Sequence, residues 1–225
     1  TGEHVLQDYI KGNHYLTAAA EAGLSDAQAD LATIFINGLG VEKDFIEAKI
    51  WCELAAKDDN TIAIRHLGLM YLNGDGVELN KTLALSWFKR GAFLGNPACQ
   101  NHLAIMYEFG QGTDVDLIDA FTYYLLVGLR NDPSSIEAIQ RLSLQLEPEE
   151  MAQGRELVNT YQKRIDGSSW SEDAINAVSI LGSEAFSEVR SLNEIKECTE
   201  AVKAIQEQEY EVARILFEAL VKADN

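Results

Sequence analysis

A period of 36 residues runs through the first half of the chain and constrains its fold more than any other feature. The pattern Leu-(Ala/Gly)-x-x-(Phe/Tyr)-x-x-Gly-x-Gly begins at Leu31, at Leu67 and at Leu103. Periods of roughly 20–50 residues are typical of repeat proteins, in which each unit buries its apolar face against its neighbours. The chain is therefore expected to form a stack of similar units.

The residue spacing predicts two amphipathic helices in each unit. Small and apolar residues at helical spacing, such as Ala27, Leu31 and Phe35, predict the first helix. An alanine recurs seventeen positions after each anchor leucine, and a large aromatic residue follows three positions later, which predicts the second helix. These pairs are Ala48 with Trp51, Ala84 with Trp87, and Ala120 with Tyr123.

Turn residues separate the two helices of each unit at equal offsets. Glycine tolerates the left-handed backbone of a helix C-terminus, and the first helices are predicted to end at Gly38, Gly74 and Gly110. Side-chain oxygens just before a helix accept hydrogen bonds from its free backbone N–H groups, and the predicted N-caps are Asp44, Asn80 and Asp116. Calcium binding is the weaker interpretation of these residues, because the carboxylates of a calcium loop alternate within about twelve residues.

The regular pattern changes after residue 131. One helix is predicted to about residue 146, and another begins at Pro148, with carboxylates in its first turn, and runs to about residue 165. We predict a repeat array with C-terminal capping helices over residues 1–166, followed by a joint at Gly167-Ser168-Ser169. Residues 167–225 are predicted to form a further helical segment, with helices at 172–189, 194–205 and 210–221, that resembles the start of a second repeat array.

The N-terminal residues resemble a second helix without its first. Tyr15 and Ala19 lie 36 positions before Trp51 and Ala55. Because both ends of the sequence fall inside a repeat, we expect the chain to be a fragment of a longer solenoid. Open repeat ends would also allow copies of the chain to stack on one another.

With these motifs in place, residues 15–131 resemble the Sel-1-like repeat family, a relative of the tetratricopeptide repeats. The family unit reads A-x-x-x-L-G-x-x-Y-x-x-G-x-G-V-x-x-D-x-x-x-A-x-x-W-x-x-x-A-A, and the second copy matches it at Gly74-Asp75-Gly76-Val77, Ala84 and Trp87. Ala32, Ala104, Thr113, Asn80, Tyr123 and Asp59 depart from it. The resemblance implies an all-α, right-handed α-solenoid of antiparallel helix pairs that serves as an adaptor or scaffold, without naming the partner.

Composition excludes several function classes. The chain has 36 acidic and 18 basic residues, for a net charge of -18, so nucleic acid is a poor partner. The longest apolar run, Phe121 to Leu129, is too short for a transmembrane helix. The sequence does not distinguish a cytoplasmic from an exported protein. The three cysteines, Cys52, Cys99 and Cys198, lack metal-ligand spacing. Cys52 and Cys99 are predicted to be core residues. Disulfide or redox chemistry is the less favoured alternative for all three.

No motif of a known catalytic or phosphate-binding site occurs, so we predict a non-enzymatic protein without cofactors. His66 and His102 occupy the same repeat position, where the first repeat has Asp30. Helix axes ~8–10 Å apart are too distant for ligands that must lie ~2 Å from zinc. We therefore predict surface histidines and no metal site. Some cysteine-rich relatives are associated with β-lactams, but their paired cysteines are missing here.

One stripe of the first helices, outside the family motif, is the best candidate binding site. Such helices line the concave face of solenoids, where apolar side chains would form a groove for a helix or an extended peptide. The alternative is that these side chains pack against neighbouring helices. The acidic surface favours a basic protein or peptide partner. Two alternative functions are an envelope or cell-wall factor that acts on glycans or β-lactams, and a self-assembling spacer. The predicted stripe consists of Ile36, Arg65, Leu69, Leu72, Asn73, Ile105 and Phe109.

Overall fold

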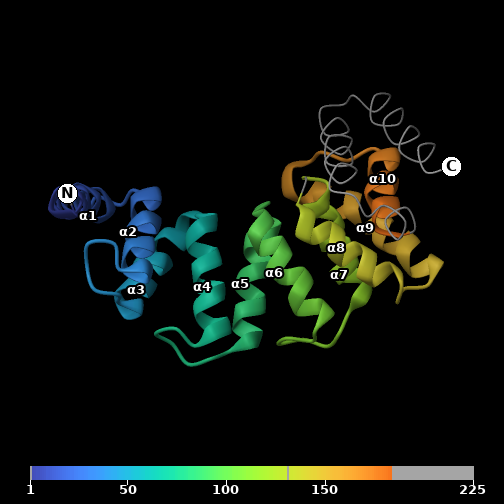
Figure 1. The fold of residues 1–225 in the computed structure, drawn as a ribbon, viewed down its shortest axis with the longest axis horizontal. Helices are drawn as coiled ribbons and strands as arrows, with labels where there is room; N and C mark the ends of the chain where they lie inside the picture. The colour runs from blue at the N-terminus through green and yellow to red at the C-terminus, as the bar shows by residue number, and fades with distance from the viewer. Residues whose placement is uncertain (1, 131, 184–225) are drawn as a thin grey trace. The chain divides into compact units, whose positions relative to one another are not determined.

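A computed structural model describes residues 2–130 and 132–183, and every regular element in those ranges is helical (Figure 1). A short 3₁₀ turn, Ala56–Asp58, follows α3. The α-helices are α1 Gly2–Glu21, α2 Ser25–Asn37, α3 Phe45–Ala55, α4 Thr61–Asn73, α5 Lys81–Phe93, α6 Pro97–Glu108, α7 Leu117–Gly128, α8 Pro133–Ser143, α9 Pro148–Asp166 and α10 Glu172–Ser183.

These helices fall into two compact units. Unit 1 consists of residues 1–99 with 111–113, and unit 2 consists of residues 100–110 and the described residues from 114 onward. The predicted boundary between an array ending at residue 166 and a second segment stays a prediction, and the helices expected at 194–205 and 210–221, together with Cys198, lie outside the described residues.

Unit 1 is built from the helix pairs that the period predicts. Helices α2 and α3 pack side by side, as do α4 and α5, while α1 packs on α2 and α3 packs on α4 (Figure 1). Its core consists largely of alanine and other small residues, so the helices approach one another closely. Gly68 shows how closely, because a Cβ atom placed there would lie 2.5 Å from the ring of Phe88.

The glycine turns of unit 1 have the predicted conformation. Gly38 and Gly74 end their helices with φ of 72° and 81°, in the left-handed region. Gly76, the second glycine of the turn after α4, also has a positive φ, of 68°, and a Cβ there would lie 2.6 Å from the Cβ of Phe45. The turn after α4 is thus held against the first residue of α3, and the N–H of Asn80 bonds the carbonyl of Tyr71 at 2.8 Å.

All three predicted N-caps are confirmed. Asp44 accepts from the N–H groups of Ile46 and Glu47, while Asn80 accepts from Leu83. Asp116 accepts from the N–H of Asp119 in unit 2. Four further side chains that were not predicted also cap helices, namely Asn60 before α4, Asn96 before α6, Asp132 before α8 and Ser171 before α10.

In unit 2, α7 packs against both α8 and α9, and α10 packs against α8. A Cβ at Gly154 of α9 would lie 2.7 Å from the ring of Phe121 on α7, so glycine sets the distance between these helices. Helices α8 and α9 match the predicted pair, and the carboxylate of Glu150 accepts from the N–H of Glu147 ahead of Pro148. Helix α10 begins where the first helix of the C-terminal segment was predicted.

Candidate protein-interaction surface

The predicted stripe residues lie on the first helices of three repeats. Unit 1 carries Ile36 on α2 and Arg65, Leu69, Leu72 and Asn73 on α4. Asn73 is exposed, whereas the other four side chains are half-buried.

Unit 2 carries Ile105 on α6 and Phe109 immediately after it. Ile105 is half-buried, and Phe109 is 60% exposed. None of the stripe side chains in either unit is fully enclosed, which satisfies the requirement that a binding surface be reachable from solvent.

Polar contacts within unit 1 join the helices that carry the stripe. Helices α2 and α4 are in contact, and the hydroxyl of Thr33 lies 3.2 Å from Nε2 of His66. The Thr33 hydroxyl donates its one proton to the carbonyl of Ala29, so Nε2–H of His66 donates to the Thr33 oxygen.

The prediction that His66 lies on the surface is wrong. Its side chain is buried, and burial, followed by the nearby Arg65 charge, lowers its pKa to about 4. His66 is therefore neutral at physiological pH. The repeat period places His66 on a helix but does not show which neighbouring helix covers its side chain. Asp30, at the same position of the first repeat, is exposed. Within the described ranges, no group of three or more His, Cys, Asp or Glu side chains is placed to hold a metal ion.

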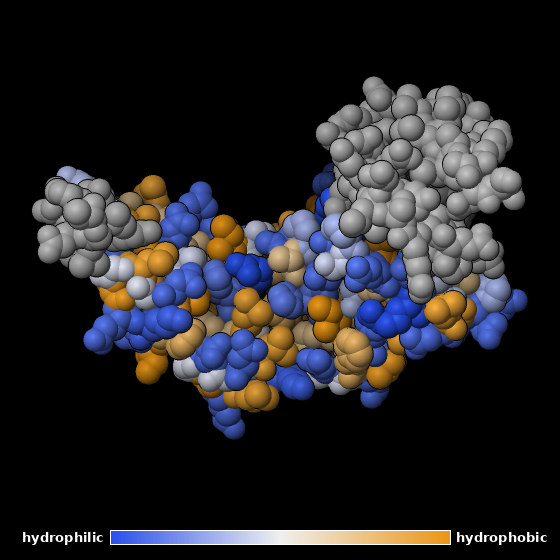
Figure 2. Space-filling view, viewed as in Figure 1, coloured by the Kyte–Doolittle hydropathy of each residue, from blue (hydrophilic) through white to orange (hydrophobic). Residues whose placement is uncertain are grey.

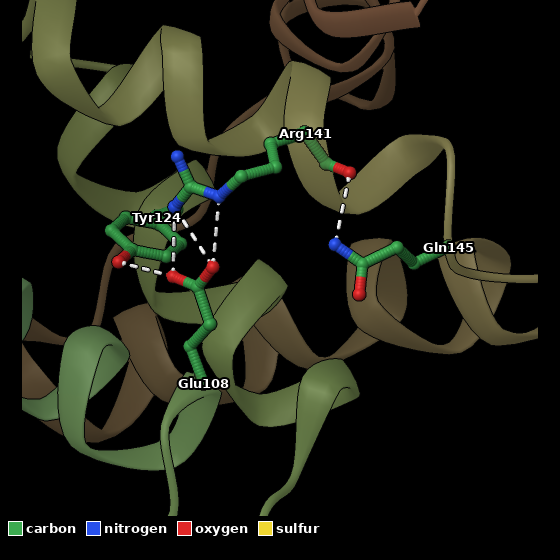
Figure 3. Close-up of polar contacts among 4 residues, drawn as sticks. All are labelled: Glu108, Tyr124, Arg141 and Gln145. Carbon is green, nitrogen blue, oxygen red and sulfur yellow. Dashed lines mark hydrogen bonds and ion pairs between the residues drawn. The ribbon is translucent and has the colours of Figure 1, made fainter.

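A buried carboxylate in an ion pair occupies the repeat position of Ile36 and Leu72 in the third repeat. Glu108 lies 36 residues after Leu72, at a position where the first two repeats are aliphatic. Its carboxylate accepts hydrogen bonds from Nε and Nη2 of Arg141 on α8, each at 2.9 Å, and from the hydroxyl of Tyr124 on α7 at 2.9 Å (Figure 3). Three elements of unit 2 thus meet at one carboxylate.

Glu108 occupies the repeat position of Ile36 and Leu72, but its pairing was not predicted from the sequence. Burial and the hydrogen bond to Glu108 raise the pKa of Tyr124, so its hydroxyl stays protonated as a donor. A buried carboxylate needs such partners, since burial of an unpaired charge is strongly unfavourable. The available signal was the interruption of an apolar series by one acidic residue. The position of Arg141, 33 residues later in a helix without the repeat motif, could not be inferred from the period.

The two described cysteines are buried and unpaired, as predicted for core residues. Burial raises the pKa of the thiols of both Cys52 and Cys99 to about 12. Thiolate is the reactive form of cysteine, so neither residue is suited to nucleophilic or redox chemistry in the folded protein.

Paired helices that recur with a 36-residue period and stack through small residues define an α-solenoid, a class built from helical repeats. Residues 1–24, 25–60, 61–96 and 97–126 match the Sel1 repeat family. These four matches cover more than half of the sequence, and the chain belongs to the Sel1 repeat family.

Solved structures give the same result. A Sel1 repeat protein from Oxalobacter formigenes is 33% identical, with a TM-score of 0.50 over 54% of this chain and 92% of that protein. The protein c5321, described as a protective antigen of uropathogenic Escherichia coli with an SLR fold, is 25% identical, with a TM-score of 0.58 over 95% of this chain. The present chain spans 49% of the length of c5321. No curated protein sequence gave a significant match.

Sel1 repeat proteins generally act as protein-interaction scaffolds, and their fold is typically non-catalytic. The described helices also include none that is both long and apolar enough to cross a bilayer. Binding to another protein is therefore the class of activity that the family supports.

Proposed function

We propose that the chain is a non-catalytic adaptor that binds a protein or peptide on the predicted first-helix stripe. The observation that carries this proposal is the partial exposure of its apolar side chains. Ile36, Leu69 and Leu72 in unit 1 are half-buried rather than enclosed. Apolar side chains held in ordered helices but reachable from solvent are typical of surfaces that receive a partner.

The competing interpretation assigns these side chains to packing between helices. Packing explains Ile64, Leu67 and Met70 of the same helix, which are fully buried. It does not require Leu69 and Leu72, because both leave part of their surface in water. The exposed amide of Asn73 adds a hydrogen-bonding group at the end of the stripe.

The charge of the chain indicates the chemistry of the partner. With a net charge of -18, the protein attracts basic molecules and repels acidic ones over distances of about 8 Å at physiological ionic strength. A basic segment with several apolar side chains fits both the apolar side chains of the stripe and the acidic charge of the chain. Its association should slow and weaken as salt is added.

The test is affinity capture from a native lysate, at low and at moderate salt, with the parent chain and a Leu69→Glu, Leu72→Glu variant. Phe93→Glu is the matched control, because Phe93 is an exposed apolar residue on the second helix α5 of unit 1. Circular dichroism establishes that all three proteins are folded. We expect a protein retained by the parent and by Phe93→Glu but lost from the stripe variant.

A second step uses the retained protein in purified form, with its affinity measured for each variant. The two glutamates on the stripe should weaken binding at least tenfold, which corresponds to about 1.4 kcal/mol. Equal affinities for the parent and the stripe variant would place the binding surface elsewhere. Retention of no protein at either salt concentration would contradict the adaptor proposal.

A further inference from the structure

A second set of exposed apolar residues in unit 1 lies on α3 and in the turn after α4. Ile46 and Ile50 occur one helical turn apart and are 67% and 48% exposed. Leu79, in the turn after α4, is 55% exposed. Hydrophobic residues interrupt the hydrophilic surface on the face drawn in Figure 2. Isolated exposed apolar residues are common on proteins, so further observations are needed.

The repeats themselves provide an internal comparison. The residues 36 positions after Ile46 and Ile50 are Thr82 and Ser86, on α5. Both are exposed, as their counterparts on α3 are. The second repeat thus carries small polar side chains at these two helix positions, so the fold of a unit does not require isoleucine there.

Ile46 and Leu79 also line one pocket of about 590 Å³ within unit 1. Tyr71 and Val77 add apolar surface to the walls. The turn that forms one wall is held in place by the close contact of Gly76 with Phe45. The pocket is thus formed by ordered elements, so a partner that binds there would not have to order them first.

The pocket wall carries one acidic and one basic side chain. Glu78 lies on its wall and, in the described part of the chain, forms no ion pair. Lys49 also lines the pocket, but its ammonium group is paired with Glu53 at 2.6 Å. A ligand would therefore meet the Glu78 carboxylate beside the apolar part of the pocket wall, which Ile46, Val77 and Leu79 form.

We propose that this surface, called here the α3 patch and consisting of Ile46, Ile50, Val77, Glu78 and Leu79, docks a basic amphipathic helix of a partner protein. Two isoleucines at positions i and i+4 form a ridge of the kind that packs into the groove of another helix. The pocket receives one bulky apolar side chain of that helix, and Glu78 pairs with a flanking lysine or arginine. An anionic membrane surface does not fit, because Glu78 repels it.

The probe is a synthetic, fluorescently labelled 14-residue peptide of leucine and lysine, with leucine on one helical face. The same peptide with glutamate in place of lysine is its control. The decisive variant is Ile46→Thr, Ile50→Ser, which gives α3 the side chains that α5 carries at the same positions. Because both positions are exposed, this variant is expected to keep the parent's circular dichroism and melting temperature.

We expect the lysine peptide to bind the parent and to bind the α3 variant at least tenfold more weakly, with no binding of the glutamate peptide. A Glu78→Gln variant should bind with a shallower dependence on salt. Unchanged affinity in the α3 variant would overturn the proposal, as would absence of binding to the parent. Binding of the parent to phosphatidylglycerol vesicles but not to the lysine peptide would also overturn it.

The stripe variant Leu69→Glu, Leu72→Glu separates this surface from the proposed adaptor site. It should bind the lysine peptide as tightly as the parent does. If the stripe variant loses the peptide and the α3 variant keeps it, the peptide occupies the stripe, and the α3 patch is not its docking site.

Discussion

At the residue scale, equivalent positions of the repeats differ in ways that affect stability. Nε1 of Trp51 donates to Glu47 at 3.0 Å, one turn earlier on α3. The equivalent Trp87 has Leu83 at that position, and its buried Nε1 has no hydrogen-bond partner among the described residues. A buried donor without an acceptor lowers the free energy of unfolding. An acceptor for the Trp87 indole should therefore stabilise the second repeat.

We predict that Leu83→Glu stabilises the protein by about 1 kcal/mol. The new carboxylate reproduces the contact of Glu47 with Trp51, and it also lies in the first turn of α5, where negative charge is favourable. Urea unfolding of the parent and the variant measures the change. In a Trp87→Phe background the substitution should recover only a few tenths of a kcal/mol, and an equal gain there would show that the indole is not involved.

The buried His66 makes stability depend on pH. Its pKa is lowered to about 4 in the folded protein from an ordinary value of 6.5. Between these values the unfolded chain binds the proton more readily, so acidification below pH 6.5 removes stability until the pH approaches 4. We expect a loss of about 1–3 kcal/mol from this residue across that window.

His66→Gln provides the comparison, since glutamine keeps a polar side chain but does not titrate in this range. The free energy of unfolding is measured from pH 7 to pH 4.5 for both proteins. The parent should lose more stability than the variant, and the difference belongs to the histidine. Parallel curves would contradict a buried, neutral His66.

At the element scale, Glu108 ties α8 to α6 and α7 within unit 2. Helix α8 lacks the motif that orients the first helices of the earlier repeats. Two hydrogen bonds from Arg141 and one from Tyr124 supply a directional connection instead. The Arg141 side chain is 49% exposed, so solvent screens part of its charge, whereas the carboxylate is buried.

We predict that Arg141→Met destabilises unit 2 by about 2–3 kcal/mol, because it leaves Glu108 buried without its counter-charge. The double variant Glu108→Leu, Arg141→Met should recover most of this loss, since leucine occupies the equivalent position 72. Chemical denaturation of the two single variants and the double variant gives the coupling energy. Additive effects would contradict a direct interaction between the two side chains.

The contrast between predictable and unpredictable elements has a physical origin. Helix pairs, glycine turns and the caps Asp44, Asn80 and Asp116 follow from local spacing, because backbone geometry at these positions depends on nearby residues. Burial of His66 and the pairing of Glu108 depend on which distant helices meet. The stripe was identified by its position on the helices, and its role in binding stays a prediction.

At the scale of the whole molecule, charge acts on folding and on binding in opposite directions. A net charge of -18 on 225 residues produces self-repulsion that disfavours the compact state. The same charge attracts a basic partner. Salt screens both interactions, with a Debye length that falls from about 30 Å at 0.01 M to about 10 Å at 0.1 M.

We therefore predict that raising sodium chloride from 0.01 M to 0.3 M increases the melting temperature by a few degrees and weakens binding of the basic partner. Differential scanning fluorimetry and an affinity titration on the same samples measure the two effects. A melting temperature that falls over this range would indicate that attractive ion pairs outweigh the repulsion.

Two of the small residues at the helix contacts are cysteines, so their reactivity can report when the helices of unit 1 separate. Cys52 and Cys99 both lie in unit 1, fully enclosed by neighbouring helices. In a protein with Cys198 replaced by serine, a thiol reagent can reach either sulfur only when those helices separate. The rate of labelling therefore gives the frequency with which unit 1 opens under native conditions, without denaturant and without an attached probe.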